Sequence, residues 1–162
     1  MLSIILFYLL LIPFSALFHE LGHGLFMLLF SRNVVRIYLG PINDTNKELF
    51  SFGRIRFHLR LSYIGFARFE GAENIQLTSA QRIIISLGGP IASLILACIS
   101  LLIVLMNNFT GETLSIIRGV AVINFLNCIG TIIPIKYPSW YKAYAGRPSD
   151  GYSALMALRK NK

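Results

Sequence analysis

The sequence predicts a polytopic α-helical membrane protein with three transmembrane helices and a small membrane-surface β-sheet after the first. Of the 162 residues, 55% are hydrophobic and only 14% are charged, which is too apolar for an ordinary soluble domain. Three stretches also reach the roughly 20 apolar residues that cross a bilayer core. They are residues 2–30, 83–106 and 114–135. We therefore expect residues 1–162 to form a single membrane-embedded domain.

The first apolar stretch, residues 2–30, is expected to be a retained transmembrane helix rather than a cleaved secretory signal. No Lys or Arg precedes it, and no small-residue cleavage site ends it. At 1.5 Å per residue it would be about 43 Å long, so we expect it to tilt or protrude. Pro13 should kink this helix or mark its outer edge, because proline removes one backbone hydrogen bond.

Between residues 34 and 70 the periodicity changes from helical to alternating. Residues 54–61 read RIRFHLRL, a polar and apolar alternation that is typical of a half-buried strand. Residues 34–39 and 63–69 are expected to form shorter strands. We expect a small sheet at the cytoplasmic membrane surface, with its apolar side against lipid or against the helices.

The second span carries a helix start signal and a glycine-rich notch. Thr78 and Gln81 have the spacing of a capping box. Gly88, Gly89 and Pro90 permit close backbone approach and interrupt the helical hydrogen bonds. This notch is compatible with helix packing alone and with a functional role beside the first helix.

The third span is expected to end at Pro134, and a short C-terminal helix follows at residues 150–160. Ser149 is the expected N-cap of that helix, because serine oxygen accepts a hydrogen bond from the first helical turn. No internal repeat is evident.

The basic residues lie in two groups beside the spans. Eight Lys and Arg fall in residues 32–82 and six in residues 136–162, whereas the 107–112 connection has none. By the positive-inside rule, the β excursion and the C-terminus are cytoplasmic and the N-terminus lies outside. We expect an integral protein of the cell membrane. Because this arrangement explains the net charge of +8, no nucleic-acid partner is expected.

The segment His19-Glu20-Leu21-Gly22-His23 lies inside the first apolar run, where ionisable side chains are costly. Two histidines four residues apart on a helix project from one face, so both imidazoles can bind one zinc ion. The intervening glutamate can then act on a water molecule at the metal. This spacing predicts zinc-dependent peptide hydrolysis with one Zn²⁺ per chain, toward the cytoplasmic end of the span.

A catalytic zinc site usually has three protein ligands, so a third must come from elsewhere in the chain. His58 belongs to the arginine-bearing face of the expected strand, and we expect it to face solvent or lipid headgroups. Asp150 is followed by Gly151, which permits close approach, but it can equally be a first-turn acidic residue favoured by the helix dipole. From the residues alone the ligand stays open among seven candidates: Asp44, Glu48, His58, Glu70, Glu73, Glu112 and Asp150.

These motifs resemble the site-2 protease family of intramembrane zinc metalloproteases, in a minimal three-helix form. The resemblance lies in HELGH within a transmembrane helix, GGP in the next span and SDG after the third. It implies that His19, His23 and Asp150 are the zinc ligands and that Glu20 is the catalytic glutamate. It also implies a transmembrane protein substrate in the lipid bilayer. A regulatory membrane partner or a homo-oligomer is compatible with the sequence.

One position departs from the family pattern. The family commonly has Asn three residues before the Pro that ends the third core helix, and this chain has Thr131 there. Asn127 lies one helical turn earlier on a similar face, so we assign the polar role near the substrate carbonyl to Asn127. The loop between Pro134 and Asp150 is also longer than the compact family versions.

A substrate helix must unwind before hydrolysis, because its own hydrogen bonds hide the peptide carbonyls. We expect an edge strand of the sheet that contains residues 54–61 to pair with the extended substrate segment by strand addition.

Two other functions remain open on the sequence. A catalytically silent zinc-binding protein could hold or regulate a transmembrane partner; Thr131 favours this alternative and Glu20 opposes it, because binding alone needs no general base. A transporter or channel subunit could use the same ionisable residues as a proton or metal relay. Three spans alone do not readily enclose a transport path, so this function would require oligomerisation.

Overall fold

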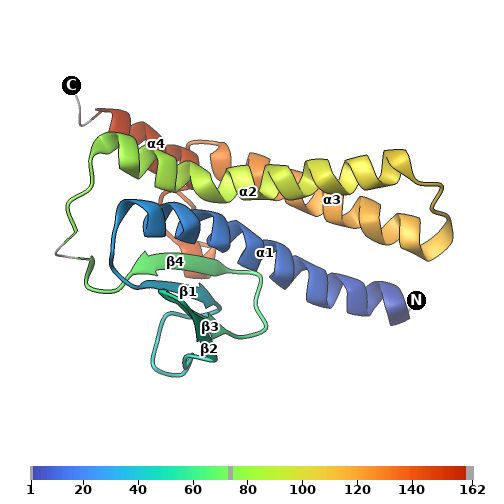
Figure 1. Cartoon of the computed structure of the whole chain (residues 1–162), viewed down its shortest axis with the longest axis horizontal. Helices are drawn as coiled ribbons and strands as arrows, with labels where there is room; N and C mark the ends of the chain where they lie inside the picture. The colour runs from blue at the N-terminus through green and yellow to red at the C-terminus, as the bar shows by residue number, and fades with distance from the viewer. Residues whose placement is uncertain (1, 73–74, 160–162) are drawn as a thin grey trace.

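The computed structural model describes residues 2–72 and 75–159, and its three long helices lie alongside one another with a small sheet against the first (Figure 1). Each of the three contains a segment long and apolar enough to cross a membrane: Tyr8–Phe30, Ser79–Met106 and Gly111–Ile132. The elements in chain order are α1 (Leu2–Phe30), β1 (Val35–Leu39), β2 (Phe50–Phe52), β3 (Ile55–Leu59), β4 (Gly65–Phe69), α2 (Ser79–Met106), α3 (Gly111–Ile132), the 3-10 helix η2 (Lys142–Tyr144) and α4 (Asp150–Arg159). The three expected helices and the sheet after the first are therefore present.

Helix α2 begins at Ser79, four residues before the apolar stretch that predicted it. The predicted capping box explains the earlier start. The Gln81 N–H donates to the Thr78 hydroxyl at 3.2 Å, and the Gln81 side-chain oxygen accepts from the Thr78 N–H at 2.9 Å. Two backbone donors at the helix end are thereby satisfied, so the helix includes polar residues that hydropathy leaves out.

Helix α3 is displaced toward the N-terminus relative to the predicted residues 114–135. It ends at Ile132, and Ile133 is already extended with φ −62° and ψ 124°. The helical backbone conformation is disfavoured for the residue that precedes a proline, so the helix ends before Ile133 and Pro134. Helix α1 matches its predicted bounds and continues through Pro13, which is therefore not the outer edge of the helix.

The sheet has the strand order β2-β3-β1-β4, with β1 parallel to β3 and antiparallel to β4. Strand β2 was not predicted, because three exposed residues are too few to show a periodicity. Strand β3 corresponds to the predicted strand 54–61 but lies between β2 and β1. The edge strands of the sheet, where strand addition could take place, are therefore β2 and β4.

The apolar face of the sheet packs against α1. Val35 and Ile37 of β1 are fully buried and form a cluster with Met27 of α1. Since side chains alternate along a strand, Arg36 faces the opposite way, where it pairs with Glu70 at 2.6 Å. The apolar side therefore faces a helix, which was one of the two expected arrangements.

The close packing of α1 on α2 depends on two glycines. A Cβ atom at Gly22 would overlap the carbonyl oxygen of Gly88, and a Cβ atom at Gly88 would lie 2.6 Å from the carbonyl oxygen of Gly22. Only residues without a side chain permit this approach. The two backbones therefore meet beside the predicted metal motif.

The sheet and α4 lie at the end of the bundle opposite the N-terminus and the α2–α3 connection (Figure 1). The two segments with excess basic residues are thus at one end of the molecule. The side of the membrane that this end faces stays a prediction.

Candidate metal and catalytic site

Helix α1 presents His19 and His23 one turn apart on one buried face. Their side chains meet through Nε2, with 3.2 Å between the two nitrogen atoms. Each ring is held from behind at Nδ1: His23 lies 2.7 Å from the carbonyl oxygen of Ile85, and His19 lies 3.0 Å from the hydroxyl of Ser93. Both anchors belong to α2. The rings are therefore oriented with both Nε2 atoms toward a common point.

Asp150 completes the group from the start of α4. Its carboxylate oxygens lie 3.1 Å from His19 Nε2 and 3.4 Å from His23 Nε2. Two ligands that each lie about 2.1 Å from a tetrahedral zinc are separated by about 3.4 Å, so this spacing fits a zinc site. Among the residues that the structure describes, these three form the group able to hold a metal ion.

Ser149 fixes the start of α4, and with it the position of Asp150. Its hydroxyl accepts from the Tyr152 N–H at 3.1 Å, which confirms the predicted N-cap. The same hydroxyl donates to the Ile133 carbonyl at 2.7 Å and accepts from the Ile135 N–H at 3.1 Å. The serine thus ties α4 to the chain that leaves α3.

The long loop between Pro134 and Asp150 does not displace the carboxylate, because the loop closes at its base. Lys136 and Pro148 form an antiparallel β-bridge. Gly151 then packs against the end of α3, where a Cβ atom would overlap the carbonyl oxygen of Ile132. The glycine that the sequence suggested for close approach is therefore needed at this contact.

Asp150 is ionised at neutral pH. Burial alone raises the pKa of its carboxyl, but the hydrogen bonds with His19 and His23 outweigh burial and hold that pKa well below its usual range. A carboxylate binds a metal only in this charged form. The local environment therefore favours the protonation state that a ligand needs.

Gly89 forms the floor of the site on α2. A Cβ atom there would overlap Nε2 of both His19 and His23. The adjacent Gly88 faces α1 and mediates helix packing. Gly88 therefore serves helix packing, whereas Gly89 faces the two histidines, and a role of the notch in metal binding stays a prediction.

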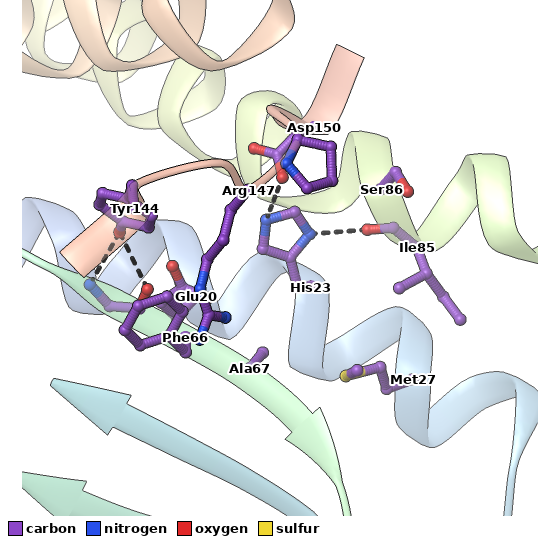
Figure 2. A pocket seen from close by; sticks show the side chains of 12 residues that line it. Glu20, His23, Met27, Phe66, Ala67, Ile85, Ser86, Tyr144, Arg147 and Asp150 are labelled. Atoms are coloured by element: carbon purple, nitrogen blue, oxygen red, sulfur yellow. Dashed lines mark hydrogen bonds and ion pairs between the residues drawn. The ribbon is translucent and has the colours of Figure 1, made fainter. Parts of the chain in front are cut away.

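Glu20 lies beside this group, 8% exposed, and lines a cavity of 270 Å³ together with His23 and Asp150. Figure 2 shows His23 between Asp150 and Ile85, with Glu20, Tyr144 and Phe66 toward the sheet. A carboxylate beside two imidazoles and a second carboxylate has the composition of a hydrolytic metal site.

Strand β4 brings its free edge to the same cavity. Gly65 contacts Glu20 closely enough that a Cβ atom at Gly65 would overlap the glutamate side chain. The hydroxyl of Tyr144 accepts from the Gly65 N–H at 3.1 Å and donates to the Gly65 carbonyl at 2.9 Å (Figure 2). Burial raises the pKa of Tyr144 well above its ordinary value, so the donor proton is retained. The edge groups of Gly65 are therefore occupied by a side chain of this same protein.

Asn127 and Thr131 of α3 line a smaller hollow of 80 Å³ with Glu20 and Asp150. The Asn127 amide donates to the Ser93 hydroxyl at 3.2 Å. The Thr131 hydroxyl donates to the carbonyl oxygen of Asn127 at 3.0 Å, within its own helix. Asn127 is thus the α3 side chain whose polar group reaches toward the site.

The other ligand candidates lie elsewhere. His58 is only 8% exposed: it stacks on Tyr38, and its Nδ1 lies 2.9 Å from the Asn46 carbonyl oxygen. The expectation that it faces solvent or headgroups is therefore wrong, because the loop carrying Asn46 covers it. The remaining candidates are Asp44 and Glu48 in that same loop, Glu70 paired with Arg36, Glu112 in the first turn of α3, and Glu73, which falls outside the described residues.

Ser93, Ile85 and Tyr144 are site residues that sequence reasoning missed. A serine in an apolar helix gives no motif, although Ser93 does lie four residues after Gly89 and so on the same helix face. The Ile85 contact uses a backbone carbonyl, so no sequence signal exists for it. Tyr144 lies in the polar loop that was noted only for its length.

Comparison with known proteins adds one match. A family model described as peptidase family M50 matches residues 7–157. No match was found among curated proteins or among solved structures. The matched residues include both histidines, the aspartate, all of α2 and α3, and α1 from residue 7 onward.

Proposed function

Because the chain belongs to peptidase family M50, the site-2 protease family of membrane metalloproteases, we propose that it hydrolyses a peptide bond in or near a transmembrane segment of a membrane protein. Membership of this family makes the chain a hydrolase, and its general activity is that of an intramembrane metallopeptidase. The observation that carries the finer proposal is the meeting of His19, His23 and Asp150 beside Glu20, where Glu20 and Asp150 line one hollow with His23 and another with His19. These three ligand residues come from opposite ends of the sequence.

We propose that His19 and His23 hold zinc through Nε2 and that Asp150 holds it through a carboxylate oxygen. Two imidazoles and one carboxylate suit zinc and leave a fourth position open for water or substrate. When bound, zinc supplies Lewis-acid polarisation of the scissile carbonyl and an activated water. The fit rests on the 3.1–3.4 Å separations of the donor atoms.

Glu20 is the proposed general base and acid. It lines the cavity next to the three donors, so its carboxylate can take a proton from the attacking water and deliver it to the leaving amine. Asn127 is proposed to face the substrate carbonyl. An amide nitrogen carries two protons, so the one that is not bonded to Ser93 remains for the substrate.

The substrate is proposed to bind as an extended strand on the edge of β4. Strand β4 is an edge strand of the sheet that contains residues 54–61. Strand addition supplies backbone hydrogen bonds to any sequence, which suits a protease that must hold an unwound helix. Because the Tyr144 hydroxyl occupies both edge groups of Gly65, the tyrosine must move away before a substrate can pair there.

A lateral hollow between α1 and α3 offers a path for the substrate from lipid. It has a volume of 340 Å³, and its lining includes the apolar side chains of Ile12, Ile123 and Leu126. Asn127 lines both this hollow and the smaller one at Glu20. An apolar opening that leads to polar residues suits a transmembrane segment.

The proposal is tested with the full chain purified in detergent and a membrane-anchored test substrate. Wild type should bind one zinc and cleave, whereas Glu20→Gln should bind one zinc and lose at least about a hundredfold in rate, the lower range for loss of a general base. Equal cleavage by both proteins would refute the mechanism. Zinc binding without cleavage by wild type would favour the catalytically silent alternative, a protein that holds a transmembrane partner.

A further inference from the structure

Ser93 lies at the point where the three long helices meet. Its side chain is fully buried in α2. Its hydroxyl oxygen lies 3.0 Å from His19 Nδ1 of α1 and 3.2 Å from Asn127 Nδ2 of α3. One oxygen atom therefore connects a proposed zinc ligand to the helix that carries the proposed substrate contact.

The chemistry of these groups assigns a direction to each bond. A histidine that offers Nε2 to a metal carries its proton on Nδ1, and that proton needs an acceptor in a buried site. The amide nitrogen of Asn127 is also only a donor. A hydroxyl oxygen has two lone pairs, so Ser93 can accept from both residues at once. Alanine or valine at this position would leave both donors unsatisfied.

The two histidines differ in what anchors them. His23 Nδ1 lies against the backbone carbonyl of Ile85, which every residue type supplies. His19 depends on a side chain, because its Nδ1 contact is the hydroxyl of Ser93. A side-chain substitution at Ser93 therefore removes the Nδ1 partner of His19, whereas a side-chain substitution at Ile85 leaves the carbonyl partner of His23 in place.

We propose that Ser93 is a positioning residue for zinc binding: it fixes the ring and the tautomer of His19, and Asn127 supports it from α3. This inference rests on the proposed function and names a residue outside the HELGH, GGP and SDG segments that carry the resemblance. Because of this linkage, a displacement of α3, such as one caused by substrate entering beside it, changes the orientation of the His19 ring through Asn127 and Ser93.

The first test compares Ser93→Ala with Ser100→Ala in the purified full-length protein. Ser100 lies two turns further along α2, is 5% exposed, and donates only to the Leu96 carbonyl of its own helix. Loss of the group that orients a metal ligand typically costs 10–100-fold in affinity. Competition with a chromophoric chelator should show zinc affinity about 10–100-fold weaker in Ser93→Ala and unchanged in Ser100→Ala, with both metal-free proteins melting alike.

The second test asks whether Asn127 acts through Ser93. Asn127→Ala should also weaken zinc binding, and the double variant with Ser93→Ala should bind zinc no more weakly than Ser93→Ala alone. Asn124→Ala is the matched control, because Asn124 is buried on the same helix and donates to Ser15 instead. It should leave zinc affinity unchanged. The Asn127→Ala arm tests the same linkage if Ser93→Ala fails to fold.

Wild-type zinc affinity in both Ser93→Ala and Asn127→Ala would overturn the positioning role and leave the proposed protease function intact. Losses that multiply in the double variant would overturn the linkage through Ser93. Absence of zinc binding by wild type is a separate outcome, and it would overturn the proposed function itself.

Discussion

Replacing Gly89 with alanine should destroy the zinc site while the helices still pack. The added Cβ atom would overlap Nε2 of His19 and of His23. Carbon and nitrogen atoms in contact normally lie about 3.5 Å apart, so each ring must retreat by about 1 Å. Zinc sites tolerate changes of only about 0.2 Å in ligand distance. The displacement thus exceeds the tolerance of the site severalfold.

The expected magnitude follows from this comparison. Loss of a group that merely orients a ligand costs about 10–100-fold in metal affinity. Gly89→Ala displaces two ligands directly, so its zinc affinity should fall by at least about 100-fold, with peptide cleavage lost in parallel. The assay is zinc competition against a chromophoric chelator in detergent, followed by cleavage at a fixed zinc concentration.

Gly130→Ala is the matched control for this prediction. Gly130 also lies in a long apolar helix, but a Cβ atom there would meet nothing within 4 Å. This variant should bind zinc as wild type does. Wild-type zinc affinity in Gly89→Ala would refute the reasoning, because the two imidazoles could not then converge beside this residue.

Tyr144→Phe should free the backbone edge at Gly65 and lower KM by at least about fivefold, because two hydrogen bonds worth about 0.5–1.5 kcal/mol each no longer compete with substrate. A higher KM would show that the phenol binds substrate instead. Thr78→Ala should reduce the free energy of unfolding by about 0.5–2 kcal/mol through loss of the α2 cap, measured by denaturant titration, with zinc affinity unchanged; unaltered stability would contradict the role of the capping box. Removal of metal by a chelator should stop cleavage and added zinc should restore it, whereas cleavage by the metal-free protein would contradict zinc dependence.

The elements with a strong local signal could be predicted from sequence. The apolar run ending at Phe30 gave the bounds of α1, and the pairing of Thr78 with Gln81 marked the start of α2 better than hydropathy did. The spacing of His19 and His23 placed them together, because four residues make about one helical turn. These features depend on neighbours along the chain.

Features that depend on contacts between distant segments could not be predicted in the same way. The alternation at residues 54–61 indicated a strand but not its neighbours, so it did not show that β2 and β4 are the edge strands of the sheet. The burial of His58 depends on a loop that folds over it. Ser93 gave no signal at all, since a serine in an apolar helix shows its role only when His19 and Asn127 are seen on either side.

The role of Asp150 could be predicted only in part. From the residues alone it was one of seven candidates, and resemblance to a family selected it. In the structure, Ser149 and Gly151 hold Asp150 against the end of α3, and a closed loop base at Lys136 and Pro148 takes up the extra chain. The length of the loop therefore has no bearing on the position of the carboxylate.

Binding of zinc by His19, His23 and Asp150 is tested most directly by X-ray absorption at the zinc edge, measured on Glu20→Gln protein loaded with one equivalent of zinc. We expect zinc to be surrounded by two imidazole nitrogens, from His19 and His23, and a carboxylate oxygen from Asp150, each at about 2.0–2.2 Å from the metal. Asp150→Ala should lose the carboxylate contribution. Zinc bound by one imidazole or none, or by sulfur from either cysteine of the chain, Cys98 or Cys128, would contradict the proposed ligand set.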